Sequence, residues 1–131
     1  MEVQMDLARI IISESSDQQM IVLKEREGER QFPIVIGSYE AFAIDRRLKG
    51  IETPRPLTHD LMASVIESLH GELERIVISD LHQGTFFARL IIRLDGELVE
   101  VDSRPSDAIA LGVAMETPIF VAEHVLREVT S

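Results

Sequence analysis

The sequence predicts one α+β domain over residues 1–131, built on a mixed, mostly antiparallel twisted sheet with helices packed on it. Segments typical of strands occur in runs, in the order βββααβββαβα, and do not alternate strictly with helices. Several neighbouring strands are joined by short turns, which produce antiparallel hairpins. The length of 131 residues is also that of a single domain with one hydrophobic core.

The first part of the chain is predicted to form three strands. β-Branched and aliphatic residues cluster at 2–12 and 20–25, on both sides of the polar stretch 13–19, which indicates a hairpin. A third strand is predicted at 31–36, and Pro33 lies inside it. Because proline has no N–H for a neighbouring strand, we expect this strand at an edge of the sheet or at a bulge.

From Ser38 the apolar residues change to a helical period, which predicts a first helix that ends at Gly50. A second helix is predicted between Thr58, a favourable N-cap, and Gly71. Its apolar residues recur at four-residue spacing: Leu61, Val65 and Leu69.

The second half of the chain is predicted to begin with a meander. Strands are expected at 73–81 and 85–94, and Asp95-Gly96 is a strong hairpin signal before a further strand at 98–101. The strand 85–94 alternates, with apolar residues on one face and arginines on the other. Pro105 suits the first turn of a third helix. A last strand at 119–122 and a short helix complete the chain.

The composition restricts the classes of function. Acidic residues outnumber basic ones by 23 to 13, and the formal charge of -10 repels phosphate backbones. Nuclease activity then requires arginines that converge in one cleft, or divalent ions that neutralise clustered carboxylates. Cysteine is absent, which excludes disulfides and thiolate sites. We find neither a secretion signal nor an apolar run that spans a bilayer, so a cytoplasmic protein without membrane contact is expected.

Polar residues concentrate at three junctions: 55–60, 80–85 and 102–107. Two of these junctions open a helix, and a helix N-terminus presents free N–H groups and the positive end of the helix dipole. Arg55 and Arg104 lie beside these helix starts. Both are therefore candidates for holding a phosphate or a carboxylate.

The same junctions carry groups for proton transfer and metal binding. An imidazole exchanges protons near neutral pH, which makes His59 a candidate acid or base, with Asp60 beside it in the sequence. The aspartates Asp80, Asp102 and Asp107 are candidate ligands of a divalent cation such as magnesium, which prefers a few carboxylates and water. No established metal-binding, nucleophile or phosphate-loop motif occurs. The residues alone therefore do not establish a reaction.

These polar residues also have a purely structural interpretation. Thr58 with Asp60, and Ser106 with Asp107, are residues that helix capping and dipole compensation select without any ligand. Spacing alone favours this capping interpretation. Arg104 can likewise form a modest structural ion pair with a neighbouring aspartate.

Several separated segments resemble, in order, the bifunctional nuclease family. They are FPIVIGSYEAFAI at 32–44, PRPLTHDLM at 54–62, ISDLHQGTFFARL at 78–90, and VDSRPSDAIALGVAMETPIFV at 101–121. Together they span most of the chain, and the combination of RPSDAIAL with THDL is specific. The resemblance implies a compact α+β domain, self-association into dimers or larger assemblies, and a nuclease activity on RNA and DNA.

Two hypotheses follow from the residues and the resemblance. The first is a nuclease that hydrolyses phosphodiester bonds of RNA or DNA with the help of Mg²⁺ or Mn²⁺. Its candidate residues are His59, Asp60, Arg104 and Asp107 for catalysis, Arg55, Arg104 and Ser106 for phosphate binding, and Asp80, Asp102 and Asp107 as metal ligands. The second is a non-catalytic oligomeric module whose polar junctions cap helices, line a subunit interface or bind a small anion. Convergence of the side chains in an open pocket supports the first hypothesis, and capping bonds with mutual ion pairs support the second.

Overall fold

The computed structural model describes residues 1–130, and the helices and strands of this range follow the predicted order. The strands are β1 (Glu2–Ile11), β2 (Gln18–Glu25), β3 (Gln31–Gly37), β4 (Glu72–His82), β5 (Thr85–Leu94), β6 (Glu97–Ser103) and β7 (Ile119–Ala122). The helices are α1 (Ser38–Leu48), α2 (Thr58–Ser68), α3 (Pro105–Ala114) and α4 (Glu123–Thr130). The predicted α+β class is confirmed.

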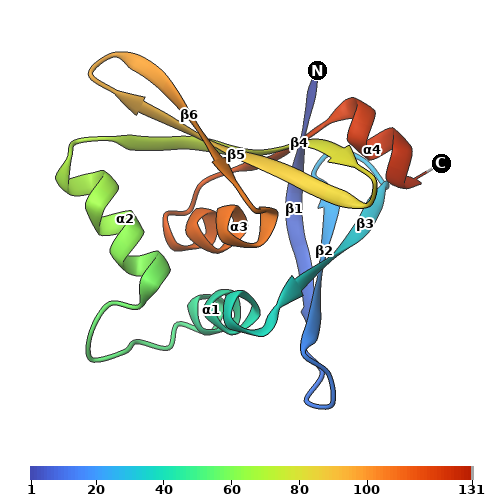
Figure 1. Cartoon of the computed structure of the whole chain (residues 1–131), viewed down its shortest axis with the longest axis horizontal. Helices are drawn as coiled ribbons and strands as arrows, with labels where there is room; N and C mark the ends of the chain where they lie inside the picture. Colours follow the sequence, from blue (N-terminus) through green and yellow to red (C-terminus); the bar gives the residue numbers. More distant parts are fainter. Residues whose placement is uncertain (131) are drawn as a thin grey trace.

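The strands form one sheet in the order β3-β2-β1-β7-β4-β5-β6. Two antiparallel meanders, β1–β3 and β4–β6, are joined by β7, which pairs antiparallel with β1 and parallel with β4. The sheet is strongly twisted, so that β1–β3 run across the direction of β4–β6 (Figure 1). The connection from β6 to β7 passes through α3, which packs on β4 and β5.

Turn chemistry and one proline account for much of this register. Asp95 and Gly96 have φ angles of 52° and 80°, and Gln83 and Gly84 have φ angles of 50° and 81°. Left-handed conformations at both central residues give a hairpin turn whose twist matches that of the strands it joins. Pro33 lies in β3, an edge strand that pairs only with β2 among the described residues. The predicted edge position of Pro33 is confirmed.

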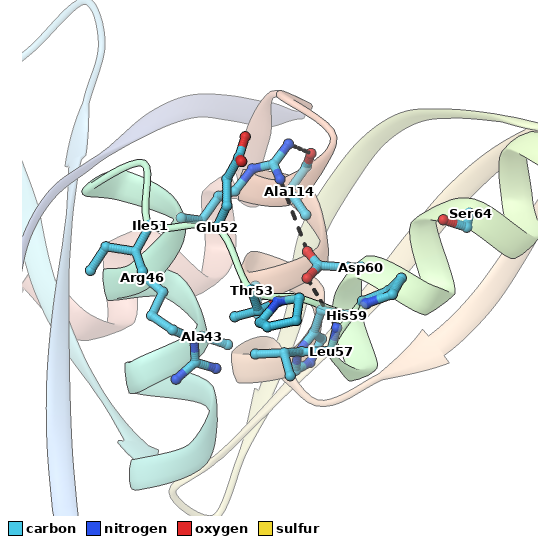
Figure 2. A pocket seen from close by; sticks show the side chains of 14 residues that line it. Ala43, Arg46, Ile51, Glu52, Thr53, Leu57, His59, Asp60, Ser64 and Ala114 are labelled. Carbon is cyan, nitrogen blue, oxygen red and sulfur yellow. Dashed lines mark hydrogen bonds and ion pairs between the residues drawn. The ribbon is translucent and has the colours of Figure 1, made fainter.

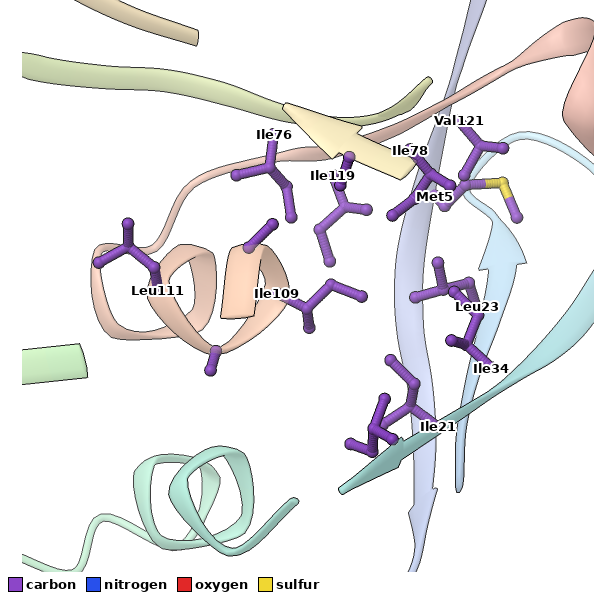
Figure 3. Packing of buried hydrophobic residues seen from close by; sticks show 14 of the residues in the cluster. Met5, Ile21, Leu23, Ile34, Ile76, Ile78, Ile109, Leu111, Ile119 and Val121 are labelled. Atoms are coloured by element: carbon purple, nitrogen blue, oxygen red, sulfur yellow. The ribbon is translucent and has the colours of Figure 1, made fainter. Parts of the chain in front are cut away.

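The core lies between the sheet and the layer formed by α1 and α3. Figure 3 shows Ile109 pointing from α3 toward the sheet, where Ile76 and Ile21 are also buried. In β5 the predicted alternation is confirmed, because Ala88 and Leu90 are buried in this core. Arg89 and Arg93 lie on the other face of the strand and pair with Glu100 and Glu74.

The apolar stripe predicted for α2 faces outward. Leu61, Val65 and Leu69 are 56%, 49% and 64% exposed, whereas Ala63 is buried and Ile66 packs against the core. Both sides of this helix carry apolar residues, and periodicity alone does not indicate which side the neighbouring helix covers. The side that contains Ala63 is the one that packs on α3.

Ion pairs of one arginine connect helix α4 to the first meander. Arg30, which follows β2, donates hydrogen bonds to Glu25 at 2.7 Å and to Glu123, the first residue of α4, at 2.9 Å. Arg30 thereby lowers the pKa of both glutamates.

Among residues 1–130, none of the helices combines the length and the apolar composition that a bilayer crossing requires.

Candidate active site

A chain of polar side chains links the three helices that lie on one side of the sheet. His59, in the first turn of α2, places Nε2 3.1 Å from Oδ1 of Asp107 in α3. The second carboxylate oxygen of Asp107 accepts hydrogen bonds from Arg104, at 2.8 Å from Nε and 2.7 Å from Nη2. Arg104 also forms an ion pair of 3.5 Å with Glu40 of α1. Residues far apart in the sequence therefore meet in one connected cluster.

The bonds of Asp107 are not those of a helix cap. A capping carboxylate accepts hydrogen bonds from the first backbone N–H groups of its helix, whereas the bonds of Asp107 described above come from two side chains. Asp60 behaves differently, because its carboxylate accepts the backbone N–H of Leu57 at 3.2 Å. Leu57 is the N-cap of α2, so the prediction that Thr58 is the cap was wrong by one residue. The capping interpretation is thus correct for Asp60 and not for Asp107, whereas the predicted ion pair of Arg104 with a neighbouring aspartate is confirmed at Asp107.

Burial within this cluster is uneven. The side chains of Glu40 and His59 are 10% and 14% exposed, whereas that of Arg104 is 68% exposed. Hydrogen bonding to Asp107, with a further contribution from Glu40, raises the pKa of the Arg104 guanidinium. The charged guanidinium of Arg104 therefore lies at the protein surface, where it pairs with the less exposed carboxylates of Glu40 and Asp107. The hydrogen bonds from Arg104 and the contact with His59 fix the orientation of the Asp107 carboxylate.

His59 faces a pocket of about 310 Å³ between α1, α2 and the loop that connects them. Figure 2 shows the lining side chains, which come from α1, this loop, α2 and α3. Arg47 is part of the pocket lining. Its guanidinium donates a hydrogen bond to the carbonyl oxygen of Ala114 at 2.7 Å and lies 4.0 Å from the carboxylate of Asp60. Arg46 also lines the pocket, on the side where Leu57 and His59 lie.

A second pocket, of about 450 Å³, lies beside the N-terminus of α3. Arg104, Ser106 and Glu40 line it, together with Thr85 and apolar residues of β3. Ser106 is only 5% exposed. Asp107 bonds to one residue that lines each pocket, His59 in the first and Arg104 in the second.

The remaining predicted site residues lie elsewhere. Asp80 accepts hydrogen bonds from the backbone N–H of Leu81 at 2.8 Å and from His124 at 3.3 Å, and these bonds lower its pKa. Asp102 is paired across the strands with Arg89, and strand alternation puts both on the sheet face opposite α3. Arg55 is exposed in the loop before α2. Within residues 1–130 no three or more histidines, aspartates or glutamates are grouped so that they could hold a metal ion.

Residues 21–131 match the bifunctional nuclease domain. The chain belongs to the bifunctional nuclease domain family. An uncharacterized protein of Mycobacterium tuberculosis (strain H37Rv) is 40% identical over 91% of this chain and 71% of its own length. Bifunctional nuclease 2 of Oryza sativa subsp. japonica is 28% identical, with 84% of this chain and 35% of the relative covered. Bifunctional nuclease 1 of Arabidopsis thaliana is 25% identical, with 79% and 33% covered. The chain thus spans about a third of the length of these plant relatives.

Three charged residues of the cluster and its pockets in this bifunctional nuclease domain are not among the residues that the sequence predicted for the site: Glu40, Arg46 and Arg47. Glu40 lies in the first turn of α1, where the positive end of the helix dipole alone favours a carboxylate. Arg46 and Arg47 lie in the last turn of α1, where the negative end of the helix dipole alone favours basic residues. A pair of adjacent arginines in an acidic chain was the available signal, but it does not reveal which way either side chain points.

Proposed function

We propose that this domain cleaves phosphodiester bonds of RNA or DNA, with His59 as the group that transfers protons and Asp107 as the residue that positions it. The observation that carries this proposal is the 3.1 Å contact between Nε2 of His59 and Oδ1 of Asp107 at the wall of an open pocket. Membership of the bifunctional nuclease domain family supports the choice of a phosphodiester substrate.

The bond to Asp107 determines which nitrogen of His59 can act as a base. An ionised carboxylate only accepts hydrogen bonds, so Nε2 of neutral His59 carries the hydrogen and Nδ1 keeps a lone pair. That lone pair can take the proton of an attacking water or ribose hydroxyl, and Asp107 then stabilises the imidazolium that forms. Arg104 holds the other oxygen of Asp107, so the carboxylate cannot rotate away. In this scheme Asp60 is a helix cap and takes no part in proton transfer.

An extended nucleic-acid strand can use both pockets. His59 and Arg104 contact the same carboxylate, so one strand can place a phosphate at each of them. Arg104 is exposed enough to reach a phosphate while it keeps Asp107. Ser106 shares the pocket of Arg104 and supplies a hydroxyl for the same phosphate. Arg55, on the loop before α2, is free to contact a phosphate further along the strand.

A divalent ion fits these residues poorly. Magnesium and manganese require oxygen ligands, commonly one or two carboxylates with water. Of the three predicted ligands, Asp80 is bonded to His124, Asp102 lies on the other sheet face, and Asp107 is bonded to Arg104, whose charge repels a cation. We therefore assign no step to a metal ion, and the assay tests Mg²⁺ and Mn²⁺ directly.

The test is cleavage of fluorescent single-stranded RNA and DNA by the purified chain, in Mg²⁺, in Mn²⁺ and in a chelator. His59→Ala removes the proposed base, so the rate should fall by about 10²- to 10⁴-fold, the usual contribution of general acid–base catalysis. His124→Ala is the matched control, because His124 forms the other His–Asp contact, with Asp80, on an exposed surface. No cleavage by the unaltered chain, or equal loss in both variants, would exclude this role.

A second candidate function, an oligomeric binding module, is favoured by the outer face of α2. Leu61, Val65 and Leu69 form a stripe of exposed apolar residues there, and exposed apolar patches commonly mark interaction sites. The partner we propose is a second copy of the chain. Light scattering should report a dimer or larger assembly at micromolar concentration, and Val65→Glu should reduce it to a monomer, unlike Leu48→Glu at the exposed end of α1. A strict monomer contradicts this proposal.

A further inference from the structure

Nearly all basic side chains of this acidic protein are neutralised by a carboxylate. Residues 1–130 contain all 13 lysines and arginines, and ion pairs involve each of them except three. The exceptions are Arg9, Arg46 and Arg55. Arg9 and Arg55 are exposed and therefore hydrated, whereas Arg46 is half-buried. A half-buried cation that gives up water without a counter-ion is costly, so Arg46 is the unusual member of this group.

Arg46 is also the one of these three arginines that lines the pocket of His59. The other charges of that pocket are already engaged or distant. Arg47 is held by Ala114 and Asp60. Figure 2 shows Glu52 at the opposite end of the pocket from the guanidinium of Arg46, which extends toward the side of Leu57 and His59. Of the two arginines that line this pocket, Arg46 is therefore the one whose guanidinium has no ion-pair partner among residues 1–130.

The chemistry of this end fits a phosphate group. A guanidinium presents paired N–H donors that match two oxygens of a phosphate. The neighbouring wall is formed by Pro54, Pro56 and Leu57, which offer apolar surface to a sugar or a base. The volume of about 310 Å³ is near the lower limit of small-ligand sites, roughly 300–1,000 Å³, and so fits one nucleotide and not a longer segment.

We propose that Arg46 binds the phosphate of a single nucleotide unit in the pocket of His59. This proposal rests on the proposed nuclease function and adds to it a substrate-contact residue, which lies on α1 and not at the helix starts. It places the scissile phosphate between Arg46 and His59. Arg104, on the far side of Asp107, is left to contact a neighbouring phosphate.

The experiment compares the binding of adenosine 5′-monophosphate, adenosine and inorganic phosphate by isothermal titration calorimetry. None of these ligands is cleaved by a nuclease, so binding is measured separately from catalysis. The unaltered chain should bind the nucleotide more tightly than either fragment. Arg46→Gln should weaken nucleotide binding by roughly ten- to a hundredfold, the loss expected for a charge-assisted contact. Arg9→Gln removes the same charge from an exposed strand and should bind like the unaltered chain.

The outcomes separate this proposal from the nuclease proposal. Equal affinity for the nucleotide and for adenosine, or for the nucleotide and for inorganic phosphate, overturns the nucleotide site. An unchanged affinity in Arg46→Gln overturns the role of Arg46. Arg46→Lys keeps the charge and should retain part of the affinity, and a complete loss in this variant while it remains folded also contradicts the assignment. Nucleotide binding that depends on Arg46, without any cleavage of RNA or DNA, supports this site and refutes only the nuclease function.

Discussion

Replacing Asp107 by asparagine separates the chemical role of this residue from its structural role. Asp107 uses both carboxylate oxygens, one for His59 at 3.1 Å and one for Arg104 at 2.7 Å. Asparagine has the same shape but only one acceptor atom, so one of the two partners must face an NH₂ group. If the amide oxygen stays with Arg104, the NH₂ group faces Nε2 of His59 and favours the wrong tautomer. If the amide flips, Arg104 loses its anchor.

The two consequences of Asp107→Asn differ greatly in size. Arg104 is 68% exposed and Asp107 is 29% exposed, and such pairs stabilise a fold by only about 0–1 kcal/mol each. The free energy of unfolding should therefore fall by no more than about 2 kcal/mol for the two contacts. The cleavage rate depends on the tautomer and orientation of His59, and it should fall by about 10²- to 10⁴-fold.

Cleavage kinetics and urea denaturation of the same preparations measure both effects. Glu100→Gln provides the control, because Glu100 also pairs with an arginine, Arg89 at 3.1 Å, but on the other face of the sheet. It should leave the cleavage rate unchanged. The reasoning fails if Asp107→Asn keeps its rate within about threefold of the unaltered chain, or if both variants lose activity equally.

Two further predictions concern the fold. Ile44→Ala should lower the free energy of unfolding by about 2–5 kcal/mol, because Ile44 is fully buried. Leu48→Ala in the same helix should change it by less than about 0.5 kcal/mol, because Leu48 is 56% exposed, and similar losses in urea denaturation would contradict these burials. Arg30 lowers the pKa of Glu25 and Glu123, so its stabilisation is present above the ordinary glutamate pKa of 4.5 and is lost as the pH falls below it. Thermal melts should therefore show Arg30→Gln less stable at pH 7, with the difference shrinking toward pH 3, and a constant difference would contradict the assignment.

The parts of the fold that could be predicted are those that local chemistry determines. The turn at Asp95-Gly96 requires left-handed backbone, which those residue types tolerate, and Pro33 is excluded from a central strand by its missing N–H. The outward stripe of α2 could not be predicted from Leu61 and Val65, because periodicity locates a stripe without identifying what covers it. The central position of β7 could not be predicted either, because it depends on pairing with β1 and β4, which are distant in the sequence.

The site was predictable to the extent that its residues lie at helix starts. His59 and Asp107 were both selected as site candidates on that basis, but their contact spans 48 positions of the chain and follows from the packing of α2 on α3. Asp102 shows the opposite case. It is two positions from Arg104 in the sequence, yet it lies on the other sheet face because it belongs to a strand. Neighbours in sequence were therefore poor guides to neighbours in the site.

The distribution of charge reconciles a net charge of -10 with the phosphate-bearing substrate that we propose. At physiological ionic strength, screening reduces the influence of exposed charges beyond about 8 Å, so a bound phosphate responds mainly to its immediate neighbours. In the pocket of His59 that neighbour is Arg46, which has no ion-pair partner among residues 1–130. On the open sheet face, in contrast, Arg75 and Arg93 are already paired with glutamates. Net charge therefore limits long-range attraction of nucleic acid, and under the proposed function the affinity arises from short-range contacts inside the pocket.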